Sequence, residues 1–148
     1  MAYNSRRAIS PGRLEDAPSH DLIVMGASAG GVEALMRLMA ALPADLPAAV
    51  CVVLHMPPQS SSHLAEILLR AGLLPVTQAQ DGEPLARGHV YVAPPDRHLM
   101  VEAGRIRCTR GPRENRVRPA IDPLFRSAAL AYGCLLYTSD AADDLTRV

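Results

Sequence analysis

The stretch Asp21-Leu22-Ile23-Val24-Met25-Gly26-Ala27-Ser28-Ala29-Gly30-Gly31 decides the fold. It begins as a short apolar run, typical of a buried strand, which we place at Asp21–Met25. It then passes through small residues into a segment, Ala29–Leu42, with apolar side chains at helical spacing, and this segment ends before Pro43. These side chains are Val32, Leu35, Met36 and Met39. The stretch therefore predicts a strand, a tight turn and a helix.

Ser28 lies on the predicted turn, and Gly26 and Gly30 complete the pattern G-x-S-x-G around it. We expect a strained backbone here, which glycine tolerates, and room for a substrate to approach. The first amides of the helix, at Ala29 and Gly30, would point at the site and stabilise an oxyanion. Two interpretations stay open: Ser28 is a nucleophile, or it only caps the helix.

A second apolar run, Ala48–Leu54, is followed by His55-Met56-Pro57-Pro58. Two such runs joined by one helix predict a βαβ unit with parallel, buried strands. Ser28 and His55 would then each follow a strand at the same edge of the sheet, where open α/β sheets bind ligands. A nucleophile and its base need this proximity. The alternative is that His55 only caps the loop before the two prolines.

Further elements follow along the chain. We expect a helix that starts near Ser61 or Ser62 and ends at Gly72, with Leu64, Ile67, Leu68 and Ala71 buried. Strands should follow at Pro75–Ala79 and His89–Ala93, and then a hairpin of Leu99–Glu102 and Arg105–Thr109 that turns at Ala103-Gly104. The last expected helix is capped by Asp122 and turns Leu124, Phe125, Ala128 and Tyr132 inward. Six arginines and one glutamate lie between Arg105 and Arg118. This loop either binds an acidic group or is simply solvated.

The composition fits one domain with a real core. The chain has 148 residues, of which 49% are hydrophobic and 20% charged, and its net charge is zero. Because the net charge is zero, no overall electrostatic field attracts nucleic acid. No apolar run is long enough for a membrane span. Cys51 is expected to be a buried thiol in a reducing cytosolic compartment. His63, His89 and His98 lack metal-ligand spacing, so we expect no metal. Residues 1–20 are expected to be a disordered lead.

Several stretches together resemble one known family. They are Ile23–Leu35, Leu54–Pro58, Glu83–Leu85 with Gly88–Pro94, Gly111–Arg116 and Arg118–Ala129, and they resemble the CheB-type protein-glutamate methylesterases. The resemblance covers residues 21–133, which it identifies as a partial catalytic domain. It implies a three-layer α/β fold, Rossmann-like, with a mainly parallel sheet, helices on both faces and an incomplete C-terminus. It also implies that Ser28 is the nucleophile and His55 the base, with Ala29, Gly30 and Met56 in the oxyanion and substrate loops.

The resembled family removes methyl esters from glutamate side chains of chemotaxis receptors, and some members also deamidate glutamine. The implied partners are methylated cytoplasmic regions of those receptors. The resemblance implies a cytoplasmic esterase without a cofactor, without nucleic-acid binding and without direct membrane insertion. Two other classes stay open. Gly26, Gly30 and Gly31 could cradle a nucleotide phosphate, although their spacing is not G-x-G-x-x-G, or the chain could be an inactive fragment of the esterase.

Three departures from the family pattern matter. Ala29 stands where a threonine often follows the serine, and Val117 stands where a histidine is common. The third member of the triad, an aspartate in a later segment of the family, is absent from this chain, and residues 134–148 look like a translated sequencing adapter, a non-native tail. Asp96 and Asp122 suit loop and helix-cap roles better. We therefore expect the chain as written to hydrolyse esters negligibly.

Overall fold

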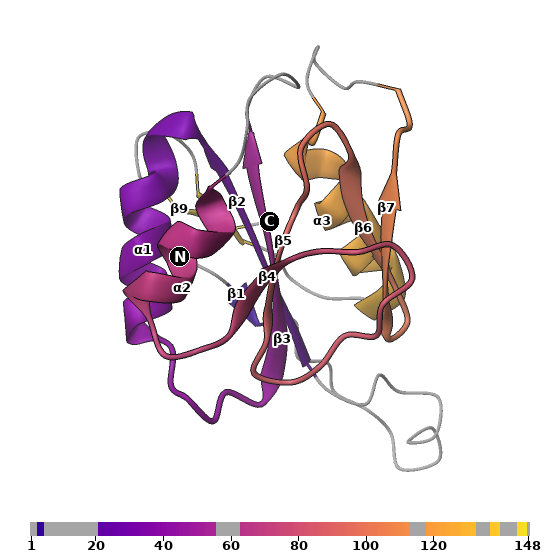
Figure 1. Ribbon diagram of the computed structural model, residues 1–148. Helices are drawn as coiled ribbons and strands as arrows, with labels where there is room; N and C mark the ends of the chain where they lie inside the picture. Colours follow the sequence, from indigo (N-terminus) through magenta and orange to yellow (C-terminus); the bar gives the residue numbers. More distant parts are fainter. Residues whose placement is uncertain are drawn as a thin grey trace, which may run out of the picture.

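Two long parallel strands form the centre of the computed structural model, which describes residues 3–4, 21–55, 63–112, 118–132, 137–139 and 145–147. β2 (Asp21–Ser28) and β3 (Ala48–His55) each have eight residues and pair in parallel along their whole length. A 3-10 turn, η2 (Ala29–Gly31), leads from β2 into α1 (Val32–Ala41). The predicted βαβ unit is confirmed, and Figure 1 shows β2 and β3 crossing the middle of the molecule.

The sheet continues beyond β3 with two shorter parallel strands. The chain forms α2 (Leu64–Ala71), β4 (Val76–Gln78) and β5 (Val90–Val92), and the strand order is β1-β2-β3-β5-β4. β5 therefore inserts between β3 and β4, pairing in parallel with both. β1 (Tyr3–Asn4) is antiparallel to β2 at the other edge. The predicted disordered lead thus contains one short paired strand, and the rest of that segment lies outside the described residues.

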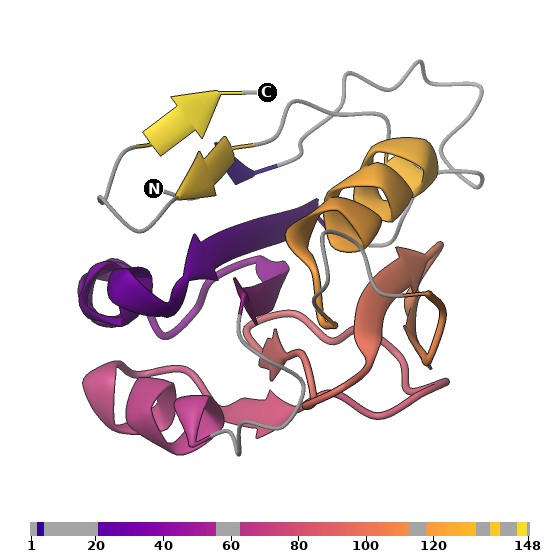
Figure 2. The ribbon, with the colours of Figure 1, turned by 90° about the horizontal axis from the view of Figure 1, so that it is seen from above.

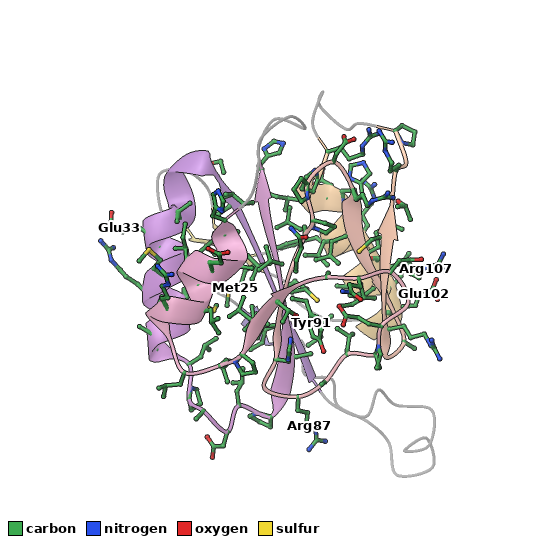
Figure 3. The ribbon with its side chains drawn as sticks, in the orientation of Figure 1. Met25, Glu33, Arg87, Tyr91, Glu102 and Arg107 are labelled. Atoms are coloured by element: carbon green, nitrogen blue, oxygen red, sulfur yellow. The ribbon has the colours of Figure 1, made fainter. Side chains whose placement is uncertain are left out.

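Two layers cover the sheet, one on each face (Figure 2). α1 and α2 lie on one face, and their side chains share a core with alternate residues of β2 and β3, such as Met25 and Val52. The other face carries the hairpin β6 (His98–Glu102) and β7 (Arg105–Thr109) together with α3 (Ile121–Tyr132). The predicted α/β fold with helices on both faces is confirmed. Figure 3 shows Glu102 and Arg107 at the outer side of the hairpin, away from α1 and α2.

α3 is attached to the hairpin as well as to the sheet. The N–H of Val101 in β6 donates a hydrogen bond of 3.0 Å to Oγ of Ser127, and that hydroxyl donates to the carbonyl of Leu124. Leu124, Phe125 and Ala128 are buried as predicted. The side chain of Tyr132 lies outside the described part. The helix thus covers β6 with a polar contact and the sheet with an apolar face.

Several predicted boundaries were wrong by a few residues. β2 and β3 extend to Ser28 and His55, because small or apolar residues continue both ladders to their ends. α3 begins at Ile121, so Asp122 is an exposed residue of the first turn and not the cap. Ile67 was predicted to be buried, but it is 37% exposed, and Met36 on the apolar face of α1 is exposed to the same extent, because the sheet contacts a narrower stripe of each helix.

The remaining predictions divide between confirmed elements and undescribed residues. The hairpin turn at Ala103-Gly104 is confirmed, and Gly104 has a φ of 77°, in the region that favours glycine. α2 starts at Leu64 after His63, whose side chain makes no capping hydrogen bond, and Ser61 and Ser62 lie outside the described residues. Within the predicted tail, β8 (Tyr137–Ser139) and β9 (Leu145–Arg147) pair antiparallel with each other.

Candidate active site

Ser28 and His55 are direct neighbours across the two central strands. They are the last residues of β2 and β3, and their Cα atoms are register partners. Neighbouring parallel strands lie about 4.8 Å apart, and side chains on the same rung leave the same face of the sheet. The two residues predicted from the sequence therefore come together at the carboxyl edge of the sheet.

Strand alternation shows which face the two side chains share. Val24 and Cys51, at even spacings before Ser28 and His55, belong to the core under α3 and the hairpin. A Cβ built on Gly26 would lie 2.6 Å from Cγ2 of Ile121, the first residue of α3. Figure 1 shows α3 starting at the end of the sheet where β3 finishes. The site thus lies between the strand ends and the start of α3.

The hydroxyl of Ser28 is not used for capping. Ser28 occupies the residue before η2, yet its side chain makes no capping hydrogen bond. Its Oγ is buried and has no hydrogen-bond partner within the described residues. A buried hydroxyl without a partner is costly, and such groups in native proteins commonly have a chemical role. The interpretation of Ser28 as a helix cap is therefore wrong.

The backbone at Ser28 is also not strained. Its φ of −86° and ψ of 174° are ordinary extended values, so the prediction of a strained elbow was wrong. Gly26 is required for another reason, because Ile121 leaves no space for a side chain at that position. The backbone amides of Ala29 and Gly30 belong to η2 and begin the helical segment directly after Ser28. A helix N-terminus presents unpaired N–H groups, which suits an oxyanion.

His55 is half-buried, and no acidic side chain partners it among the described residues. No hydrogen bond or ion pair joins it to an aspartate or glutamate in the part of the chain that the structure describes. Asp122 is exposed on α3. Asp96 contacts Arg118 and Arg110 at 2.8 Å each, so its carboxylate is engaged elsewhere. Met56 lies outside the described residues.

The two cysteines in the described part of the chain do not offer a second nucleophile. Cys51 and Cys108 are both free and buried. Burial raises the pKa of Cys108 to about 11 and raises the pKa of Cys51 well above its ordinary value. Both thiols are therefore protonated at neutral pH, whereas the thiolate is the reactive form. The expectation that Cys51 is a buried thiol is confirmed.

Three of the other histidines lie in the described part of the chain, and they have structural or surface positions. Nε2 of His89 lies 2.8 Å from Oγ1 of Thr77, its ring stacks on Tyr91, and burial lowers its pKa. His63 is exposed, and His98 is buried against α3. Within the described ranges, no group of three or more histidine, cysteine, aspartate or glutamate side chains could hold a metal ion.

The sequence did not reveal the polar contacts around the start of α3. Arg118 belongs to the segment that was expected either to bind an acidic group or to be solvated, and it is buried and contacts Asp96. His98 contacts both Pro112 and Ala120. Each partner lies 14 to 22 residues away along the chain, so no local spacing signals the contact.

Comparison with known proteins identifies the family. Residues 23–137 match the family model described as CheB methylesterase. The protein-glutamate methylesterase/protein-glutamine glutaminase 4 of Myxococcus xanthus is 48% identical over 113 residues, which are 76% of this chain and 32% of that protein. The corresponding enzyme of Hydrogenovibrio crunogenus is 41% identical over 120 residues, 78% of this chain and 32% of its own length.

A solved structure supports the same conclusion. The crystal structure of the CheB methylesterase catalytic domain of Thermotoga maritima matches with a TM-score of 0.67 and 37% identity, over 75% of this chain and 60% of that one. The chain belongs to the CheB methylesterase family. It spans about a third of the length of the curated relatives named above. Among the helices that the structure describes, none is long and apolar enough to cross a membrane.

Proposed function

We propose that Ser28 and His55 are the nucleophile and the general base of a protein-glutamate methylesterase. One observation carries the proposal: a buried serine hydroxyl, without a hydrogen-bond partner among the described residues, shares the last rung of two parallel strands with a histidine. A serine is a weak nucleophile until a neighbouring base removes its proton. In structures without substrate this hydrogen bond is often long or unformed, and it tightens when the substrate binds.

The reaction proceeds in two steps. Oγ of Ser28 attacks the carbonyl carbon of a glutamyl methyl ester while His55 takes its proton, and the proton then passes to the departing methoxide, which leaves as methanol. Water, deprotonated by His55, next attacks the acyl-serine, releasing the glutamate carboxylate and restoring Ser28. The amides of Ala29 and Gly30 stabilise the negative oxygen in both steps.

The substrate class and partners follow from the family. The related proteins are called protein-glutamate methylesterases and protein-glutamine glutaminases, and we assign this site to glutamyl esters of chemotaxis receptors in the cytoplasm. Glutamine side chains present the same carbonyl with ammonia as the leaving group, so deamidation needs no further residue. Met56 belongs to the proposed substrate loop.

A serine-directed fluorophosphonate probe tests the proposal on the 148-residue chain itself. The folded protein should be labelled at Ser28, as located by mass spectrometry. Ser28→Ala should abolish labelling, and His55→Gln should slow it by about 10²-fold or more, the usual contribution of a general base. Thr77→Val, which removes a hydroxyl on β4, is the matched control and should react like the wild type.

Two outcomes would contradict the proposal. Labelling that persists in Ser28→Ala would mean that the probe reacts elsewhere. A folded wild-type chain that does not react at all would favour a phosphate cradle at the same turn or an inactive fragment of the esterase, because a serine without an activating base ignores the probe.

A further inference from the structure

Two buried polar side chains meet at the start of α3, and the proposed reaction does not use them. Within the described residues, the buried polar or charged side chains are His98, with 3% of its surface exposed, and Arg118, with 9%. Burying such groups is unfavourable unless their hydrogen bonds are satisfied. Both groups are hydrogen-bonded, to residues that lie just before β6, just after β7 and directly before α3.

The contacts of His98 show which of its two ring nitrogens carries the proton. The backbone N–H of Ala120 donates to Nδ1 at 3.3 Å, and Nε2 lies 2.6 Å from the carbonyl oxygen of Pro112. An amide N–H can only donate and a carbonyl can only accept, so Nδ1 is the acceptor and Nε2 carries the proton. His98 is therefore a neutral imidazole that joins β6 to the residue directly before α3.

The guanidinium of Arg118 ties the same segment, two residues before Ala120, to the residues that flank the hairpin. Its Nε donates to both the carbonyl oxygen and Oδ1 of Asp96 at 2.9 Å, and its Nη1 donates to the carbonyl of Gly111 at 3.0 Å. Nη2 completes a two-nitrogen contact with Oδ1 of Asp96 at 2.8 Å. This planar arrangement needs the fixed fork of arginine, which a lysine ammonium does not reproduce.

The start of α3 in turn contacts the strand that carries Ser28. Ala120 precedes Ile121, whose side chain fills the space over Gly26, two residues before Ser28 on the same face of β2. Asp96 itself has a φ of 58°, a conformation that is unusual for a residue other than glycine and that the contacts around it maintain. The polar contacts and the proposed nucleophile are thus joined by one continuous set of packed groups.

We propose that His98 and the Asp96–Arg118 pair are positioning residues, which fix the start of α3 against Gly26 and thereby fix Ser28 opposite His55. This inference rests on the proposed role of Ser28. Of the two hydrogen bonds of His98, the one from the N–H of Ala120 to Nδ1 fixes the start of α3. The link from Nε2 to Pro112 holds only the neighbouring loop.

Two substitutions of His98 separate these links. Asparagine places an acceptor where Nδ1 lies and loses the contact with Pro112, whereas glutamine places its amide where Nε2 lies and loses the acceptor for Ala120. Labelling by the fluorophosphonate is measured per folded molecule. His98→Gln and Arg118→Lys should lower the maximal labelling rate at least tenfold without changing the half-saturating probe concentration. His98→Asn should stay within about threefold of the wild type.

Arg110→Met is the matched control, because Arg110 contacts the same Asp96 carboxylate from the exposed side. It should label like the wild type. Equal labelling rates in His98→Gln, Arg118→Lys and the wild type, with only the melting temperatures lowered, would overturn the inference.

Hydrogen exchange separates this inference from the proposed function. If the wild type does not react with the probe, the proposed function fails. The rate of amide hydrogen exchange then tests whether His98 positions the start of α3 and the strand β2. His98→Gln should then raise exchange at Ala120 and also at Gly26 to Ser28. Faster exchange at Ala120 alone would show that the start of α3 does not position the strand.

Discussion

Gly26 illustrates how closely the candidate site is packed. An added Cβ would lie 2.6 Å from Cγ2 and 3.0 Å from Cγ1 of Ile121, so the side chain of Ile121 would have to move. The glycine in the G-x-S-x-G pattern is thus required by a neighbour from a distant part of the chain. A pattern in the sequence identified the position, and only the fold reveals the reason.

Gly26→Ala should lower the free energy of unfolding by about 1–3 kcal/mol, the usual cost of overpacking a core. Urea denaturation measures this change. Ile121→Ala removes the three atoms nearest to the new methyl group, so the double variant should lose less than the sum of the two single variants. Strict additivity would mean that the two residues do not compete for the same space.

Some residues of the site could be predicted from the sequence and others could not. Ser28 and His55 each follow an apolar run, and parallel strands bring such ends together, so their meeting was foreseeable. The burial of Arg118 was not, because its partner Asp96 lies 22 residues earlier and looks like any other loop acid. Long-range polar pairs have no period that a sequence displays.

At the scale of elements, α1 and α2 approach each other more closely than their sequences suggest. Gly72 ends α2, and an added Cβ there would lie 2.4 Å from the carbonyl oxygen of Met39 in α1. The φ of Gly72 is −146°, which any residue adopts, so its role is to allow backbone contact.

Gly72→Ala should lower the free energy of unfolding by roughly 3 kcal/mol, at the upper end of overpacking costs, because a backbone atom cannot rotate away. Thermal or urea unfolding checks this value. Gly104→Ala is the comparison: nothing lies near that position, but its φ of 77° is left-handed, so about 1–2 kcal/mol is expected. A smaller loss at Gly72 than at Gly104 would contradict the close contact.

The elements themselves were largely predictable, whereas their edges and order were not. Continuous apolar runs mark β2 and β3, and they are buried on both faces as predicted. No local pattern predicts that β5 inserts between β3 and β4, since the residues of a short or apolar strand do not indicate which strand it pairs with. The exposed Ile67 shows that helical spacing identifies a face without defining its width.

On the scale of the whole molecule, the site described here contains two of the groups that a serine triad uses. His55 has no acidic partner within the described residues. In serine proteases an aspartate holds the histidine in the correct tautomer, and its replacement by asparagine lowers the rate by about 10⁴. Ser28 and His55 could therefore be correctly placed while turnover stays low, because no acidic side chain among the described residues holds His55.

We expect this chain to release methanol from methylated receptor negligibly. A chimera that continues after Gly133 with the corresponding segment of the Thermotoga maritima relative should restore turnover by orders of magnitude. Methanol release, matched for folded protein, measures both, and the chimera with Ser28→Ala is the control. Equal turnover by the chain and the chimera would mean that His55 functions without that segment.

The shared rung of β2 and β3 also makes the site a test of correct folding. Side chains alternate with a period of two, so a slip of one residue between these strands would turn either Ser28 or His55 to the opposite face. A misfolded sheet could keep its apolar core and its helices and still lose all reactivity. The fraction of molecules that react with the probe therefore counts those in which the central strands have paired correctly, independently of how compact the rest has become.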